Sequence, residues 1–321
     1  MFGRSVHRPD RSLSAALDLL LGGDESGLAL ALDREPDLVG LRASSTRAPY
    51  DGYFHGATLL HHVAGNPFVS PLPAGIVAMT RLLLERGADV DAVTLQGPGQ
   101  PDDIGWTTLG LVATSSVARE AGHQAALMEL LIGAGADVDA RAGGCIMGAL
   151  YYGESEAAER LARNGAMLDL AAAAGVGDIG RLSEILNDEA RLEAALLARP
   201  GSPGSIADRL AHYSRVPWPA TPDLQDVLGL ALAYAALHGR VEALRLLLDA
   251  GADPNHRPPF DSRATALHRA AMGDHADAVR LLVEAGADPR LRDLEHHATP
   301  LRWAAYLGRT GALEALKAVD G

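Results

Sequence analysis

A short glycine-containing motif returns five times along this chain, and that return constrains its fold more than any other feature. The copies are RGADVDA at 86–92, AGADVDA at 134–140, NGAMLDL at 164–170, AGADPNH at 250–256 and EAGADP at 284–289. Each copy follows an apolar stretch and places glycine where a helix would end in the left-handed conformation. Self-similarity of this kind indicates a solenoid, in which every unit covers the apolar face of its neighbour.

A second motif opens several of the same units. It reads TLLHHVA at 58–64, TTLGLVA at 107–113, TALHRAA at 265–271 and TPLRWAA at 299–305. Together with the apolar ridge AVRLLV at 278–283 and the glycine motif, it resembles the ankyrin-repeat pattern T-P-L-H-x-A-A, V-V-x-L-L-L and G-A-D-P/V. The resemblance implies an all-α fold, an ankyrin-repeat solenoid of about eight helix–turn–helix units with extended finger loops and a concave groove.

The resemblance covers nearly the whole chain, so we expect one domain over 1–321. Its approximate units are 11–40, 53–92, 102–140, 141–169, 170–192, 226–255, 261–290 and 294–321, with an insert at 193–225.

Three connections depart from the family pattern. GNPFVSPLP at 65–73 and TSSVAREAGH at 114–123 lengthen the turns of two consecutive units, and we expect two loops side by side at one edge. The Pro- and Gly-rich insert predicts a loop with a short helix over 206–213.

Composition narrows the choice of partner and compartment. The net charge is −13, which opposes binding to nucleic acid. The apolar run 13–21 contains Asp18 and is too short to cross a bilayer, so no membrane partner is expected. Because Cys145 is the only cysteine, a disulfide within the chain is impossible. We expect a soluble protein in the cytoplasm.

No recognised catalytic pattern occurs, and Lys317 is the only lysine available for Schiff-base or P-loop chemistry. The resemblance implies that His61 and His268 brace neighbouring units. Adjacent histidines such as His296 and His297 point in different directions, so no metal site is expected. No cofactor is predicted and the catalytic residues stay unknown. The sequence favours a protein that is not an enzyme.

Candidate binding residues come from the fingers and the ends of first helices, which face the concave groove in the family. They are Tyr53, Phe54, His55, His62, Asn66, Trp106, Tyr151, Tyr152 and His238. The same alignment assigns further residues to this surface: Gly65, Thr114, Ser115, Gly175, Val176, Leu237, Met272, Gly273, Tyr306 and Leu307 at the ends of first helices, and Asp103, Ile104, Asp261, Ser262, Glu295 and His296 in the fingers. Aromatic side chains there fit either local packing or recognition, since Tyr and Trp dominate binding hot spots.

Two functions follow. The first is a non-enzymatic module that recognises a protein partner through the concave groove and finger loops, centred between the second and sixth units. The alternative is a small-molecule-binding protein or an enzyme with a His/Tyr-lined pocket in that groove, where His55, His62, Tyr151, Tyr152 or His238 would orient the ligand or move protons.

Overall fold

The computed structural model describes residues 8–43, 54–65, 71–95, 105–188, 219 and 222–320. The chain forms two compact units, Met1–Ala140 and Arg141–Gly321. The described residues are helical apart from turns and one isolated antiparallel bridge between Val93 and Thr107, which confirms the all-α prediction. None of the helices described has the length and apolar character needed to cross a membrane.

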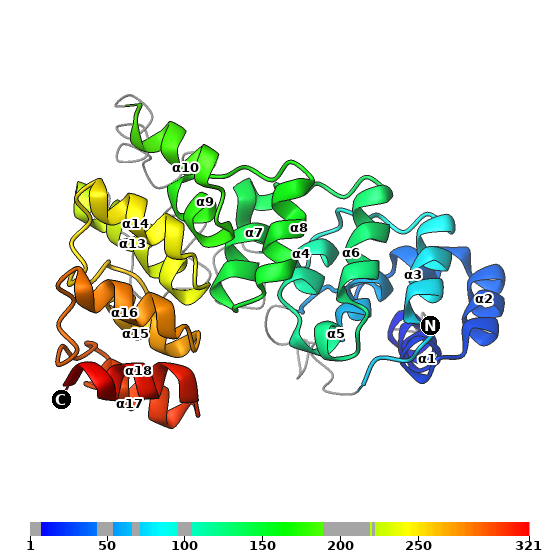
Figure 1. Cartoon of the computed structure of the whole chain (residues 1–321). Helices are drawn as coiled ribbons and strands as arrows, with labels where there is room; N and C mark the ends of the chain where they lie inside the picture. The colour runs from blue at the N-terminus through cyan, green and yellow to red at the C-terminus, as the bar shows by residue number, and fades with distance from the viewer. Residues whose placement is uncertain are drawn as a thin grey trace, which may run out of the picture. The chain divides into compact units, whose positions relative to one another are not determined.

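The first unit is a succession of short helices (Figure 1). They are α1 (Arg8–Gly22), α2 (Glu25–Arg34), the 3-10 helices η1 (Pro36–Gly40) and η2 (Leu59–Ala64), α3 (Ile76–Glu85), α4 (Thr108–Ala113), α5 (Ser116–Glu120) and α6 (Gln124–Gly133).

The second unit consists of helix pairs that follow one another through Figure 1. They are α7 (Ala140–Tyr151) with α8 (Ser155–Arg163), α9 (Leu170–Val176) with α10 (Ile179–Leu186), α13 (Leu224–Leu237) with α14 (Val241–Asp249), α15 (Ala266–Met272) with α16 (Ala276–Glu284), and α17 (Pro300–Tyr306) with α18 (Thr310–Asp320). Neighbouring pairs share a core of Ala and Leu side chains, such as the fully buried Leu267 and Leu282.

The threonine and histidine of the opening motif fix where the first helix of a pair begins. The Thr265 N–H and hydroxyl lie 3.3 and 2.8 Å from His268 Nδ1, and His268 Nε2 lies 3.0 Å from the carbonyl of Ala298 in the next finger. His61 repeats this arrangement, with Nε2 3.0 Å from the Ala92 carbonyl. The expected bracing role of both histidines is therefore confirmed.

Glycine follows the helices α3, α6, α8, α14 and α16, at the five places that the motif predicts, whereas Asn187 caps the end of α10. Gly87, Gly135, Gly165, Gly251 and Gly286 have φ between 87° and 95°. A side chain disfavours this left-handed conformation, which explains why glycine recurs at the position.

Two local structures in the first unit differ from the expectation. The stretch 114–123 contains the helix α5 instead of only a loop, because Ser115 Oγ accepts the Ala118 N–H at 3.1 Å. The first helix of the unit at 53–92 is 3-10, because the ring of His62 and the N–H of His61 take the Thr58 carbonyl that an α-helical bond would use.

Ser115 Oγ also donates to the Ala64 carbonyl at 2.6 Å, so this residue of the second lengthened turn contacts the end of η2. Residues 66–70 of the first lengthened turn lie outside the described part of the chain. The same is true of 206–213 and most of the insert.

Candidate functional site

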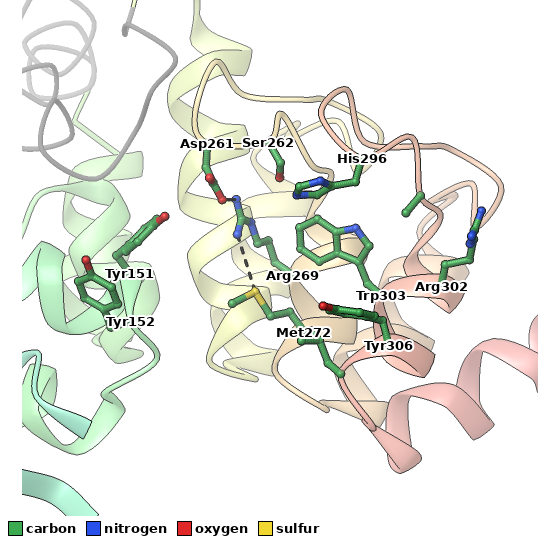
Figure 2. Close-up of a pocket in the computed structure, with 12 residues that line it drawn as sticks. Tyr151, Tyr152, Asp261, Ser262, Arg269, Met272, His296, Arg302, Trp303 and Tyr306 are labelled. Carbon is green, nitrogen blue, oxygen red and sulfur yellow. Dashed lines mark hydrogen bonds and ion pairs between the residues drawn. The ribbon is translucent and has the colours of Figure 1, made fainter. Parts of the chain in front are cut away.

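A half-open pocket of about 700 Å³ lies in the second unit (Figure 2). We call it the aromatic pocket, after Tyr151, Tyr152, Trp303 and Tyr306. Its other lining residues are Asp261, Ser262, Arg269, Met272, His296, Ala298, Arg302 and Leu307.

The walls of the aromatic pocket come from two helices. Tyr151 ends α7 and Tyr152 follows it, with the two rings edge to face at 5.0 Å. Trp303 and Tyr306 lie three residues apart on α17, so they share one face of that helix. Tyr152 is 55% exposed and Tyr306 is 91% exposed. Large aromatic surface is therefore open to solvent here.

The floor is built around a buried cation. Arg269 of α15 lies 2.7 Å from the carboxylate of Asp261, and its guanidinium carbon lies 5.9 and 5.7 Å from the ring centres of Phe260 and Trp303. A buried charge is tolerated when it is paired, so Asp261 compensates Arg269. The aromatic rings add cation–π attraction.

A finger loop brings Ser262 into the same space. The non-glycine residues on both sides of it, Asp261 and Arg263, have φ of 50° and 48° in the left-handed region. Ser262 is 3% exposed, and its side-chain Oγ has no hydrogen-bond partner among the described residues. Its backbone carbonyl accepts the Leu294 N–H at 3.1 Å. Backbone strain of this kind persists only where the surrounding contacts hold it.

Asp293 orients the neighbouring wall. Its carboxylate accepts the N–H groups of Glu295, His296 and Ala298 and the Trp303 indole N–H, at 2.6 to 3.1 Å. Burial acts to raise the pKa of Asp293, but the hydrogen bonds outweigh it and lower that pKa. An ionised carboxylate therefore fixes the finger and the Trp303 ring together.

The phenol of Tyr151 titrates above its ordinary range. Burial is the largest cause of the raised pKa, and the negative charges of Asp261 and Glu295 raise it further, while Arg269 opposes them. Tyr151 is therefore a neutral hydroxyl near two carboxylates at neutral pH.

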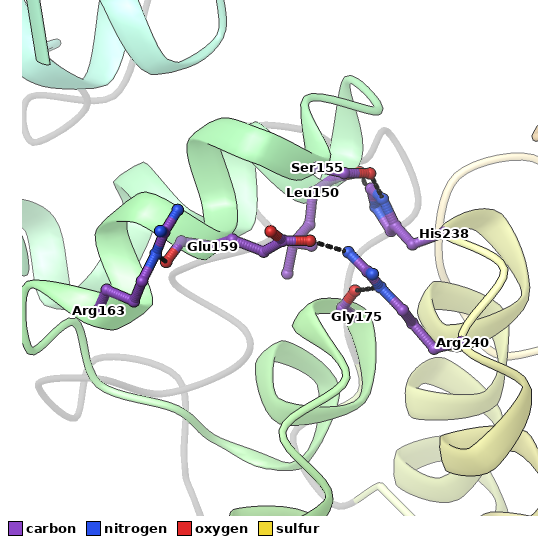
Figure 3. A network of polar contacts seen from close by, with 7 residues as sticks. All are labelled: Leu150, Ser155, Glu159, Arg163, Gly175, His238 and Arg240. Carbon is purple, nitrogen blue, oxygen red and sulfur yellow. Dashed lines mark hydrogen bonds and ion pairs between the residues drawn. The ribbon is translucent and has the colours of Figure 1, made fainter. Parts of the chain in front are cut away.

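Among the residues predicted from the sequence, Tyr151 and Tyr152 line the aromatic pocket, whereas His238 is buried nearby in a polar network (Figure 3). His238 Nε2 lies 2.9 Å from the Leu150 carbonyl and so carries the proton, which leaves Nδ1 to accept from Ser155 Oγ at 2.6 Å. Desolvation lowers the pKa of His238 to about 4.

The rest of this network is an ion pair between α8 and the start of α14. Arg240 lies 2.6 Å from Glu159 and donates from Nε to the Gly175 carbonyl at 3.1 Å (Figure 3). The contacts hold α8, α9 and the α13–α14 turn together, which is a structural role.

The predicted residues of the first unit lie mostly in its interior. Phe54, His62 and Trp106 are buried, and the rings of Phe54 and His62 meet edge to face at 5.2 Å. Burial gives these three side chains packing contacts and argues against direct contact with a partner, so their binding role stays a prediction. His55 is partly exposed and also untested as a binding residue. Tyr53 and Asn66 lie outside the described residues.

Sequence reasoning missed Arg269 and Trp303 as site residues. Both occur inside the opening motif, in TALHRAA and TPLRWAA, where they look like framework. The sequence did contain one indication of a site. Arg269 and Trp303 occupy the variable position x of the pattern T-P-L-H-x-A-A, where a cation and an indole are not needed for the repeat itself. Tyr306, Ser262 and His296 align with the groove-facing surface and do lie in the aromatic pocket.

One cluster of potential metal ligands occurs in the described part of the chain. Oxygen or nitrogen atoms of Asp223, Asp226 and His256 lie within 4.8 Å of one another. The two aspartates form the capping box that begins α13, and His256 Nε2 lies 2.9 Å from Asp226. Helix capping thus accounts for the cluster.

A comparison with protein families supports the repeat in the C-terminal part of the chain. Residues 232–320 match the family model of ankyrin repeats in three copies. Among solved structures, the chain is similar to the human ASB11 ankyrin repeat domain, with 20% sequence identity and a TM-score of 0.34 over 82% of this chain and 97% of that chain. No curated protein matches the chain.

Proposed function

Because this chain contains ankyrin repeats, matched by the family model at residues 232–320, we propose that it is a non-enzymatic binding module whose aromatic pocket holds part of a protein partner. Ankyrin repeats generally mediate interactions between proteins. Their stacked units offer an extended surface suited to that task.

The observation that carries the proposal is the exposed aromatic surface at the pocket. Tyr306 and Tyr152 contribute little to the core of the described unit, yet each presents a ring with a polar tip in the pocket that also contains the ion pair of Arg269 and Asp261. Such side chains supply much of the binding free energy in protein interfaces because they exclude water and still fix orientation.

Quantitative affinity capture from native lysate tests this proposal. The baits are the wild-type chain, the double variant Tyr152→Ala/Tyr306→Ala, and Arg245→Ala, an exposed control on α14. We expect at least one protein that is retained by the wild type and the control and lost by the double variant. Identical captured sets for all three baits would exclude the aromatic pocket as the binding surface.

A small-molecule ligand is the second candidate. The pocket volume of about 700 Å³ falls within the range of ligand pockets, and Tyr151 and Tyr152 both line it. Of the three histidines expected to orient the ligand or move protons, His62 and His238 are buried elsewhere, and His55 does not line this pocket. Mass spectrometry of the same eluates for small molecules distinguishes the two candidates.

We also propose that the protein is located in the cytoplasm and does not bind nucleic acid. A cytoplasmic location is supported by the cysteine content, since the single cysteine, Cys145, is buried and forms no disulfide. The net charge of −13 supports a partner other than nucleic acid.

A further inference from the structure

The pocket wall formed by Tyr151 and Tyr152 belongs to a short turn between two helices. α7 ends at Tyr151 and α8 begins at Ser155, so one tyrosine is the last residue of a helix and the other lies beyond it. Gly153 in this turn has a φ of 78°, in the left-handed region that favours glycine. Helix ends fray, so contacts from elsewhere in the chain decide how firmly the two tyrosines are held.

One side chain from another helix pair bonds to both ends of this turn. His238, which follows α13, donates from Nε2 to the Leu150 carbonyl at 2.9 Å, immediately before Tyr151 (Figure 3). Its Nδ1 accepts from Ser155 Oγ at 2.6 Å, three residues after Tyr152 (Figure 3). His238 is 6% exposed, and hydrogen bonds are electrostatically stronger in such surroundings than in water. The imidazole therefore bridges the two ends of the turn.

The bridge depends on small residues in the helix between the two pairs. α9 follows α8 and packs against α13, and its sequence is LAAAAGV. A Cβ added at Gly175 of α9 would lie 2.9 Å from the Leu150 side chain, too close for ordinary van der Waals contact. Arg240, two residues after His238, donates to the Gly175 carbonyl at 3.1 Å (Figure 3). The lack of a side chain at Gly175 thus leaves room for Leu150 beside this network.

The position of the turn affects the whole pocket through the tyrosine rings. The ring centre of Tyr151 lies 5.7 Å from that of Phe260, edge to face, and Tyr152 meets Tyr151 in the same way at 5.0 Å. Figure 2 shows these two tyrosines on one side of the pocket, with Trp303 and Tyr306 on the other. A shift of the turn would therefore change the space between the two walls.

From these contacts we infer that His238 is a positioning residue for the aromatic pocket, which fixes the turn of Tyr151 and Tyr152 and thereby raises the affinity for the partner. The inference rests on the proposed function. His238 does not line the pocket, so it acts through the tyrosines and not by contact with the partner. Side chains that are already held in the bound geometry lose less conformational entropy on binding, which strengthens binding.

Fluorine NMR of the full chain, produced with 3-fluorotyrosine, tests the positioning step without a partner. Single Tyr→Phe variants assign the resonances of Tyr151, Tyr152 and Tyr306. His238→Leu removes both bonds of the bridge, and Ser155→Ala removes one of them while leaving the buried imidazole in place. Both variants should shift or broaden the resonances of Tyr151 and Tyr152 and leave that of Tyr306 unchanged.

Ser183→Ala is the matched control, because this serine lies on α10 and does not line the pocket. It should leave all three resonances unchanged. Unchanged resonances of Tyr151 and Tyr152 in Ser155→Ala and His238→Leu would overturn the inference. Equal changes at all three tyrosines would also overturn it, because they would show that the bridge supports the whole unit and not this turn.

The affinity step is measured with the protein that the wild type captures from lysate and Tyr152→Ala/Tyr306→Ala loses. Its Kd should rise several-fold for His238→Leu and for Ser155→Ala. His238→Gln should restore most of the affinity, because its amide has an N–H donor for Leu150 and an oxygen acceptor for Ser155. A merely structural role would lower Tm in His238→Leu and leave the Kd of the folded protein unchanged.

Failure of the inference and failure of the proposed function give different results. Shifted tyrosine resonances with an unchanged Kd would overturn the inference and keep the binding function. If no captured protein depends on Tyr152 and Tyr306, the proposed function and the affinity step both fail, and the fluorine spectra alone decide the positioning step.

Discussion

Asp293 shows how one ionised side chain can hold a finger loop and a pocket wall together. It accepts three backbone N–H groups and the Trp303 indole, so both carboxylate oxygens are used. Asn at this position would turn an NH₂ group toward backbone donors. We expect Asp293→Asn to lower the free energy of unfolding by about 2 kcal/mol, because buried donors lose their acceptor. Urea denaturation measures the change.

The pH dependence of this variant gives a second check. Since the folded state lowers the pKa of Asp293, its ionised form stabilises the protein above the unfolded pKa of about 3.9 and loses this effect as the pH falls through the folded value. The difference between wild type and Asp293→Asn should therefore be full at pH 7 and shrink below about pH 4. A difference that stays constant on acidification would contradict an ionised Asp293. The exposed change Asp277→Asn is the control.

At the level of single residues, the sequence predicted framework roles better than site roles. The placement of His268 followed from the opening motif, because that histidine bonds to groups which every unit provides. Arg269 and Trp303 required the structure. They occupy the same place of consecutive opening motifs, so the repeat puts their helices α15 and α17 side by side, but the motif does not give the side-chain directions that pair Arg269 with Asp261 and place its guanidinium over the Trp303 ring.

At the level of the helix, the apolar ridge of α16 is the clearest test of the repeat. Leu282 is fully buried and Leu281 nearly so. Leu282→Ala should cost about 2–5 kcal/mol, through lost burial and the cavity left behind. The denaturation midpoint of this variant is compared with that of the exposed control Arg280→Ala, whose side chain forms an ion pair with Asp277. An unchanged midpoint for Leu282→Ala would place the ridge elsewhere.

The ends of the helices were easier to predict from the sequence than the type of helix. The ends at Gly251 and Gly286 were predictable, because left-handed backbone conformation favours glycine. The 3-10 form of η2 and the existence of α5 could not be predicted from the sequence. They depend on side chains that compete for backbone groups, the ring of His62 for Thr58 and the hydroxyl of Ser115 for Ala118, and the family pattern does not contain these residues.

For the whole molecule, one domain over 1–321 stays a prediction that cooperativity can decide. If every repeat depends on its neighbours, Leu282→Ala should move a single unfolding transition of the entire chain. Fluorescence and far-UV circular dichroism should then give coincident curves. Two transitions, of which only one responds to the substitution, would show that the units Met1–Ala140 and Arg141–Gly321 unfold separately.

Metal removal is a second test on the whole chain. The histidines and aspartates that lie close together, such as Asp226 and His256, already pair with one another or cap helices. We therefore expect dialysis against EDTA to leave the denaturation midpoint and the capture of protein partners unchanged. A stoichiometric metal in elemental analysis that survives dialysis would contradict this expectation.

Acid should destabilise the molecule through its buried histidines. His61, His62, His238 and His268 each have a pKa lowered to about 4, with burial as the largest cause. In His61 and His268, Nδ1 also faces a threonine N–H, so a proton there would meet a second donor. The unfolded chain binds these protons near pH 6.5, the folded chain only near pH 4.

Stability is consequently full above about pH 6.5 and falls as the pH drops toward 4, by up to about 1.4 kcal/mol per pH unit for each histidine. Urea titrations at pH 7, 6 and 5 measure the slope. His268→Asn should lower stability at pH 7 and make the slope shallower by one histidine. His297→Asn, an exposed control whose φ of 51° asparagine tolerates, should leave the slope unchanged. The range lies above the one in which Asp293 titrates, so the two effects separate. Equal stability at pH 7 and pH 5 would mean that these histidines are protonated in the folded protein.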